Sequence, residues 1–89
     1  MLFMVIERFK NGDPRPVGKR FREAGRTLPD CVRYHKSWID ATGGRCFQIM
    51  EAADAESLSP WLAYWRDLVD FEIIPIVSSS EFWAGIDVD

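Results

Sequence analysis

The chain has 89 residues and a mass of 10.3 kDa, which allows one domain, since domains shorter than about 50 residues rarely hold a core. Its composition, 47% hydrophobic and 13% aromatic, excludes a disordered chain. The net charge of −3 disfavours binding to nucleic acids or anionic membranes, so we expect a single domain over residues 1–89 that binds neither.

The first two elements are predicted from a strand-forming run and a helical repeat. Leu2 to Ile6 is apolar on both alternating faces and predicts a first strand. An Asp-Pro pair at 13–14 is typical of a helix start, and apolar residues then recur at helical spacing until Pro29. We expect a first helix over roughly 14–27.

A hairpin follows, with strands predicted over 31–40 and 45–51. A two-residue turn at Gly43 and Gly44, or a four-residue loop from Ala41 to Gly44, joins the two strands. Both turns pair odd-numbered with even-numbered positions, and a three-residue loop would exchange the two faces.

Apolar residues from 58 to 68 recur at helical spacing and predict a second helix. Its main body starts at Ser59 and Pro60, and Asp54 is the alternative start of an extra turn. Residues 71–77 predict a fourth strand, which Pro75 places at a sheet edge because proline cannot donate a ladder hydrogen bond.

A short terminal helix is expected after the fourth strand, capped by Ser79 or Ser80 and carrying Phe82, Trp83 and Ile86. The element order β-α-β-β-α-β predicts an α+β, ferredoxin-like fold. Its four-stranded antiparallel sheet has the order 4-1-3-2 and carries both helices on one face.

Two helices cover only one face of such a sheet, and apolar strand residues remain on the other. We therefore expect two copies to stack their sheets as a homodimeric α+β barrel. The alternative is a monomer whose segment 82–86 folds back as a lid.

The hairpin pairing predicts two sets of side chains. Tyr34, Trp38, Phe47 and Ile49 are expected beneath the helices, where Trp61 and Trp65 of the second helix meet them. The ligand-pocket candidates are Tyr34, Trp38, Phe47, Trp61 and Trp65. The dimer-face candidates are His35, Ser37, Cys46, Gln48 and Met50, with Ile74 and Ile76 of the fourth strand.

Sequence motifs do not assign a catalytic function, because the chain has no GxGxxG, P-loop, HExxH or serine-elbow motif. His35 is the one side chain that ordinarily titrates near neutral pH, and Tyr34 and Arg33 beside it complete the candidate catalytic set. An interface role for His35 is the favoured interpretation.

Charged residues are interpreted mainly as surface groups. On the first helix, Arg20 alone flanks the apolar stripe and is expected to reach inward, whereas the others form a solvated face: Arg15, Lys19, Arg22 and Arg26. The acidic residues Glu7, Glu51, Asp70 and Glu72 are expected to form salt bridges with Arg8, Arg33 or Arg45 rather than to act as a catalytic pair.

No metal site or cofactor is expected, since Cys31, Cys46 and His35 lack zinc-ligand spacing. The chain shows neither a signal peptide nor a run of roughly 20 apolar residues. We expect a cytoplasmic protein.

Four segments, MLFMVIERFK, RFREAGRTLP, RYHKSWIDATGGRCFQIME and WRDLVDFEIIPIVSS, resemble a family of short bacterial proteins known only as a domain of unknown function. The resemblance covers roughly residues 2–80. It implies membership of the dimeric α+β barrel superfamily, whose members include cofactor-independent monooxygenases, lactone isomerases and haem enzymes. None of their catalytic motifs can be placed on this chain.

These observations predict a small homodimeric module that binds a small apolar or weakly acidic molecule between sheet and helices. The alternative is a cofactor-free enzyme of the monooxygenase or isomerase type. In either case, the expected partners of the protein are a second copy of itself and a small-molecule ligand.

Overall fold

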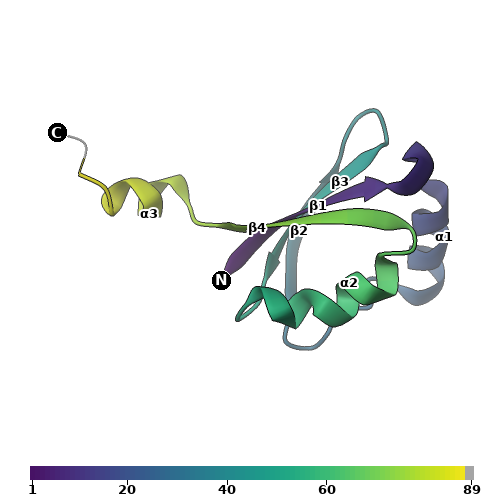
Figure 1. Ribbon diagram of the computed structural model, residues 1–89, viewed down its shortest axis with the longest axis horizontal. Helices are drawn as coiled ribbons and strands as arrows, with labels where there is room; N and C mark the ends of the chain where they lie inside the picture. Colours follow the sequence, from purple (N-terminus) through teal and green to yellow (C-terminus); the bar gives the residue numbers. More distant parts are fainter. Residues whose placement is uncertain (88–89) are drawn as a thin grey trace.

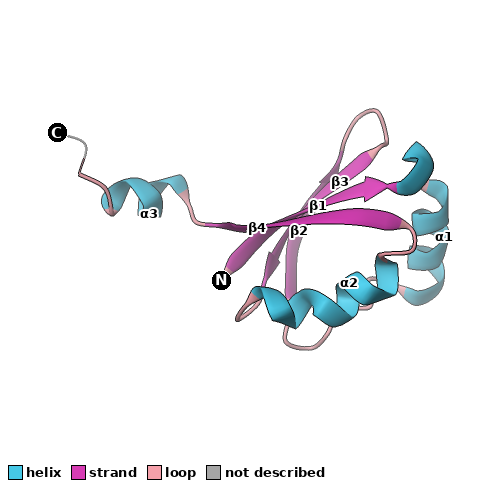
Figure 2. Ribbon diagram, viewed as in Figure 1, coloured by secondary structure: helices cyan, strands magenta, loops and turns pink. Residues whose placement is uncertain are grey.

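The computed structural model describes residues 1–87 of the chain (Figures 1 and 2). Positions 88 and 89 of the predicted 1–89 domain lie outside the described residues. The elements are β1 (Leu2–Phe9), η1 (Lys10–Gly12), α1 (Arg15–Ala24), β2 (Arg33–Ile39), β3 (Arg45–Glu51), η2 (Ala55–Leu58), α2 (Ser59–Trp65), β4 (Val69–Ile76) and α3 (Ser79–Ala84).

The four strands form one antiparallel sheet in the order β2-β3-β1-β4, which confirms the predicted α+β class and strand order. Pro75 lies opposite Phe3 on the edge strand β4. The missing N–H of this proline therefore costs the sheet no interior hydrogen bond.

The first helix is shorter than predicted. It ends at Ala24 because Gly25 follows with φ +72°, a left-handed conformation that glycine adopts without steric cost. Arg26 therefore lies beyond the helix, in the loop that leads to β2.

The second helix is preceded by an extra turn that starts at Asp54, the alternative start that the sequence offers. The carboxylate of Asp54 accepts a hydrogen bond of 2.9 Å from the backbone N–H of Ser57 and caps η2, which leads directly into α2. At the terminal helix the cap is Ser78, whose hydroxyl accepts a 3.0 Å hydrogen bond from the N–H of Glu81, so the predicted caps Ser79 and Ser80 are one or two residues late.

The core lies between the helices and the face of the sheet that carries the odd-numbered residues of β1. Phe3 and Val5 are 1% and 0% exposed, and Trp61 of α2, 1% exposed, is among the residues that cover them. Leu58 and Trp65 are also buried there. Burial of these aromatic and aliphatic side chains is the main stabilising contribution available to the domain.

The hairpin has the four-residue loop Ala41 to Gly44, and Ile39 pairs with Cys46 as odd-with-even parity requires. A β-bulge at His35 breaks this parity, so that Tyr34 pairs with Met50. The bulge places Tyr34 on the covered face beside Met50, beneath the helices as predicted, and separates it from Trp38, which lies on the other face.

The predicted sorting of the remaining hairpin residues between the two faces is wrong. Gln48 pairs with the buried Val5 and lies beneath the helices, as do Cys46 and Met50. Phe47, which pairs with Ile6, lies on the other face together with Ile49 and Trp38. The pairing parity was right, but the burial of β1 decides which set the helices cover.

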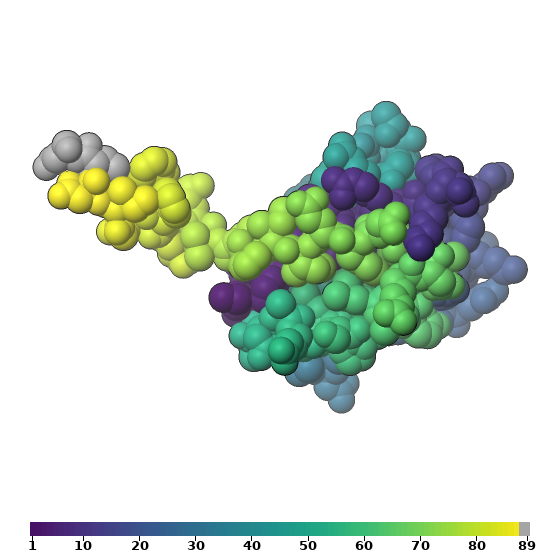
Figure 3. Space-filling view, viewed as in Figure 1, coloured from purple at the N-terminus to yellow at the C-terminus, as the bar shows by residue number. Residues whose placement is uncertain are grey.

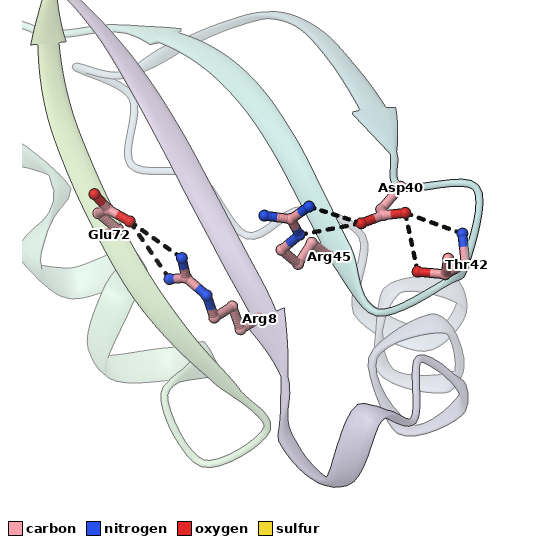
Figure 4. Close-up of polar contacts among 5 residues, drawn as sticks. All are labelled: Arg8, Asp40, Thr42, Arg45 and Glu72. Carbon is pink, nitrogen blue, oxygen red and sulfur yellow. Dashed lines mark hydrogen bonds and ion pairs between the residues drawn. The ribbon is translucent and has the colours of Figure 1, made fainter.

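We call the uncovered side of the sheet the open face. Its apolar residues are only partly buried or exposed, and Trp38 is 46% exposed: Leu2, Met4, Ile6, Trp38, Phe47, Ile49, Ile74 and Ile76. Arg8 and Glu72 form a 3.4 Å ion pair across β1 and β4, whereas Arg45 pairs with Asp40 at the hairpin loop (Figure 4).

The C-terminal helix α3 stands away from the rest of the molecule (Figures 1 and 3). Its Phe82 and Trp83 side chains are 50% and 59% exposed, and Ile86 just after it is 41% exposed. The alternative in which residues 82–86 fold back as a lid is therefore not the arrangement that the structure shows.

Candidate functional site

A cavity of about 320 Å³ lies between the sheet and the two main helices. Its apolar wall comes from both helices and from the strands: Phe9, Val17, Phe21, Ile39, Trp61 and Trp65. A small polar group faces the same space: Glu7, Arg26, Ser37, Cys46 and Gln48. Few polar groups within a mainly apolar wall are typical of a small-molecule site.

Glu7 is the buried acid of this cavity and is only 6% exposed. It comes from β1, where its odd position places it on the covered face between Val5 and Phe9. Burial raises the pKa of the Glu7 carboxyl, and hydrogen bonding to Gln48 and Cys46 and the charge of Arg26 partly offset this rise. The carboxyl therefore takes up a proton at a higher pH than an exposed glutamate does.

Cys46 lies directly opposite Glu7 in the β1–β3 ladder. Burial, together with the neighbouring Glu7 carboxylate, raises the pKa of the Cys46 thiol to about 12. A thiol with this pKa stays protonated at neutral pH, so it is a poor nucleophile and serves as a weak hydrogen-bond donor.

Arg26 brings a positive charge to the cavity. Its Nε donates a 3.4 Å hydrogen bond to Oε1 of Gln48, and Gln48 in turn interacts with the carboxylate of Glu7. Its guanidinium carbon lies 3.6 Å from the centre of the Tyr34 ring, in a cation–π contact. The amide of Gln48 thus connects the buried acid to the arginine.

The backbone of Arg26 is anchored by two indole groups. Trp61 and Trp65 both donate hydrogen bonds from Nε1 to its carbonyl oxygen, at 3.0 and 3.2 Å. Trp65 also donates to Oγ1 of Thr27 at 3.0 Å, and Thr27 itself has φ +59°. These contacts satisfy both buried indole N–H groups and hold the loop after α1 at the cavity wall.

This arrangement can bind a small molecule that combines an apolar body with one acidic or hydrogen-bonding group. Arg26 can pair with an anion, the Glu7 carboxylate can accept a proton or a hydrogen bond, and the aromatic wall can bury a ring.

The structure brings together some of the predicted pocket residues. Trp61 and Trp65 line the cavity, and Tyr34 reaches its edge through Arg26 and through a 2.7 Å hydrogen bond between its hydroxyl and that of Ser37. Trp38 and Phe47 lie on the open face, on the opposite side of the sheet.

The predicted dimer-face residues are divided between the two faces. Cys46, Gln48 and Met50 are buried beneath the helices, and Ser37 lines the cavity. Ile74 and Ile76 lie on the open face, paired with Met4 and Leu2.

The three predicted catalytic candidates do not form one site. Nε2 of His35 lies 2.8 Å from Oε1 of Glu51, and this contact lowers the pKa of the Glu51 carboxyl. Arg33 pairs with Glu51 across the hairpin, and Tyr34 points to the other face. None of His35, Arg33 and Glu51 lines the cavity.

Sequence reasoning missed Glu7 and Arg26 as site residues. Glu7 was assigned to a surface salt bridge, yet it shares its parity with Phe3, Val5 and Phe9, and this alternation was a signal of burial. Arg26 was placed on the solvated face of a helix that in fact ends before it, whereas Arg20 pairs with Asp67 outside the cavity wall.

These features define an α+β protein with a four-stranded antiparallel sheet and a cavity beneath its helices. Residues 1–87 match the family described as a domain of unknown function (DUF3303), and the chain belongs to that family. This confirms the family resemblance seen in the sequence. The comparisons found no match among curated proteins or among solved structures.

Residues 1–87 contain neither a metal-binding cluster nor a membrane-spanning helix. No group of three or more histidine, cysteine, aspartate or glutamate residues in this range is placed to hold a metal ion. No helix in the same range is long and apolar enough to cross a membrane.

Proposed function

We propose that this protein is a homodimeric module that binds a small, weakly acidic and largely apolar molecule in the cavity between sheet and helices. The observation that carries the proposal is the convergence of Glu7, Arg26 and Gln48 on a cavity walled by aromatic side chains. Buried polar groups have a free-energy cost that a purely structural core avoids. Their place on the wall of a cavity suits recognition of a ligand.

The size of the cavity limits the ligand. A volume of about 320 Å³ is at the lower end of the roughly 300–1,000 Å³ usual for ligand sites, so a molecule with one or two rings fits. An acidic hydroxyl on such a molecule would meet Arg26 as an anion or Glu7 as a hydrogen-bond donor. The proposed ligand class is therefore phenols, enols and small aromatic acids.

The test uses 4-nitrophenol, whose absorption spectrum changes when it ionises and so reports both binding and charge state. We expect the wild-type protein to bind the phenolate. Arg26→Gln should weaken binding by about tenfold or more, since a hydrogen bond to a charged group contributes about 1.5–3 kcal/mol. Arg22→Gln, an exposed position on α1, is the matched control and should bind as wild type does. Equal affinities for both variants, or no binding at all, would overturn the proposal.

A cofactor-free enzyme of the isomerase or monooxygenase type is the second candidate function, and the raised pKa of Glu7 favours it. Both reaction types begin with removal of a proton from the substrate, and a buried carboxylate is a stronger base than an exposed one. Glu7 replaces His35 as the base in this scheme, because it lines the cavity and His35 does not.

The probe for this second function is 5-nitrobenzisoxazole. A carboxylate base takes its C3 proton while the ring N–O bond breaks, and the product is 2-cyano-4-nitrophenolate, which is followed by absorbance. We expect Glu7→Gln to lose the acceleration, and Glu56→Gln, which changes an exposed acid in η2, to keep it. Equal rates for wild type and Glu7→Gln would leave a binding module without base catalysis.

The open face supports the proposed homodimer. Its apolar side chains form a continuous surface across all four strands, and a soluble monomer seldom leaves such a surface in water. We therefore place two ferredoxin-like domains face to face, as in a dimeric α+β barrel. Two-fold pairing is the commonest closed arrangement and covers both open faces at once.

Light scattering coupled to size exclusion tests the dimer. We expect twice the chain mass at micromolar concentration. Ile49→Arg, in the central strand β3 of the open face, should yield a monomer because each copy would bury an unpaired charge in the apolar interface. Ala63→Arg, on the exposed side of α2, should remain dimeric. A folded monomer at all concentrations for the wild type contradicts the proposal.

A further inference from the structure

We propose that residues 77–87, which we call the arm, pack on a second copy of this chain along its strand β2. The inference rests on the proposed homodimer and adds to it a second contact surface. The arm belongs neither to the cavity wall nor to the open face.

The arm has an apolar surface that its own chain does not cover. Phe82 and Trp83 pack edge to face against each other, with ring centres 5.3 Å apart, and both remain at least half exposed. A hollow of about 520 Å³, lined by Leu2, Ile76 and Glu81 among others, lies at the root of the arm. Figure 3 shows the arm standing clear of the body from this point on.

The arm is nevertheless a defined helix. Ser78 caps it, and the N–H of Phe82 donates a 3.0 Å hydrogen bond to the Ser78 carbonyl. A helix of six residues has little stability of its own in water, because nucleation costs more than so few hydrogen bonds return. Such a helix needs a packing surface, and its apolar side chains show the kind of surface that it needs.

Charge indicates which part of a second copy receives the arm. From residue 77 onward the sequence contains acidic residues and no lysine or arginine, and Glu81 lies within α3. On the open face of β4, Asp70 and Glu72 lie toward the end remote from the arm, where they pair with Lys10 and Arg8 of the same chain. In contrast, β2 carries Arg33 and Lys36 at the other edge of the sheet.

Two simple two-fold arrangements are possible for stacked sheets. An axis across the strands places β4 over β4 of the partner in the opposite direction, so the acidic arm emerges beside the acidic start of that strand and away from β2. An axis along the strands places β4 over β2 of the partner with the same register, so the acidic arm emerges beside the basic start of that strand. Charge complementarity favours the second arrangement.

The strand register then locates the arm. Ile76, where the arm leaves β4, pairs with Leu2, and Leu2 also pairs with Glu51, which in turn pairs with Arg33. The end of β4 and the start of β2 therefore lie at the same end of the sheet. An arm that leaves β4 emerges beside Arg33 and Lys36 of the partner.

The first experiment measures the dimer dissociation constant by sedimentation equilibrium. We expect Phe82→Ser and Trp83→Ser each to raise it at least tenfold, with the far-ultraviolet circular dichroism of the sheet domain unchanged. Fluorescence adds a direct readout: the difference spectrum between wild type and Trp83→Phe should shift to shorter wavelength as the wild-type dimer forms.

The second experiment is a charge-reversal cycle between the arm and β2. Glu81→Lys and Lys36→Glu should each weaken the dimer, and the double variant should recover most of the lost affinity. Glu56→Lys, which reverses an exposed acid of η2, is the matched control and should leave the dissociation constant unchanged.

The outcomes separate the two proposals. A wild-type protein that stays monomeric overturns the homodimer and, with it, the arm. A stable dimer that is indifferent to Phe82→Ser and Trp83→Ser overturns the arm alone. A dimer that these two variants weaken, but in which the double charge reversal restores nothing, overturns the placement along β2.

Discussion

Arg20 and Asp67 join the first helix to the turn that follows the second. Two parallel hydrogen bonds, of 2.8 and 2.7 Å, connect the guanidinium to both carboxylate oxygens, and Arg20 also donates to the carbonyl of Tyr64 at 2.9 Å. Helix α1 has no fully buried residue of its own. This clamp is therefore one of the contacts that hold α1 over the cavity.

The clamp predicts a pH-dependent contribution to stability. Hydrogen bonding by Arg20 holds the pKa of the Asp67 carboxyl below its usual range. The contribution is thus present above the ordinary aspartate pKa of about 3.9 and is lost as pH falls through the lowered value. Asp67→Asn should lower the melting temperature at pH 7, and the difference should shrink in acid. Calorimetry across this range checks it, and a difference independent of pH would contradict it.

The contribution of Glu7 to stability should change with pH in the opposite direction. Because burial raises the pKa of its carboxyl, the ionised form opposes folding at neutral pH, and stability is gained as pH falls through the raised value. Glu7→Gln should therefore be more stable than wild type at pH 8, and this advantage should decrease towards pH 4. Urea titrations at several pH values measure it. A variant that is less stable at every pH would show that Glu7 is a structural residue.

Replacing Trp65 with a small residue should cause a large loss of stability. Its side chain is 4% exposed and anchors the loop after α1 through two hydrogen bonds. Trp65→Ala should lower the free energy of unfolding by about 3–5 kcal/mol. The control is Tyr64→Ala, at a 44% exposed neighbour, which should cost less. A loss below about 1 kcal/mol for Trp65→Ala is incompatible with a buried position.

The two thiols should react at very different rates. Cys31 is exposed, whereas Cys46 is buried and its thiol has a pKa of about 12. An aromatic disulfide such as dithiobis(nitrobenzoate) should modify Cys31 in the native protein and should react with Cys46 only after unfolding. Cys31→Ser should then show no fast phase. A fast reaction in that variant would mean that the cavity exposes Cys46.

Much of the fold could be predicted because local signals agreed with each other. The edge position of β4 was predicted both by Pro75 and by the topology, and the strand order is the one observed. The hairpin parity was also right, because turn residues at Gly43 and Gly44 limit the loop length. The homodimer stays a prediction.

The site was harder to predict because it depends on tertiary choices. Phe47 and Ile49 are more apolar than Cys46 and Gln48, so composition indicated the wrong face for the helices. The helices cover the other face, which buries Glu7 at the cavity wall. Burial of this carboxyl costs free energy because the charged form loses its hydration. A glycine that ends α1 early then turns Arg26 towards Glu7.

His35 lies in the β-bulge of β2, and the pairing of β2 with β3 gives it no partner residue of its own. Tyr34 pairs with Met50 and Lys36 with Ile49, so the partners are consecutive although the strand residues are not. Deleting His35 would leave an unbroken ladder, with Tyr34 still beside Arg26. Length differences among family members should therefore collect at this point of β2, where the loss of one amino acid leaves the pairing of Tyr34 and Lys36 intact.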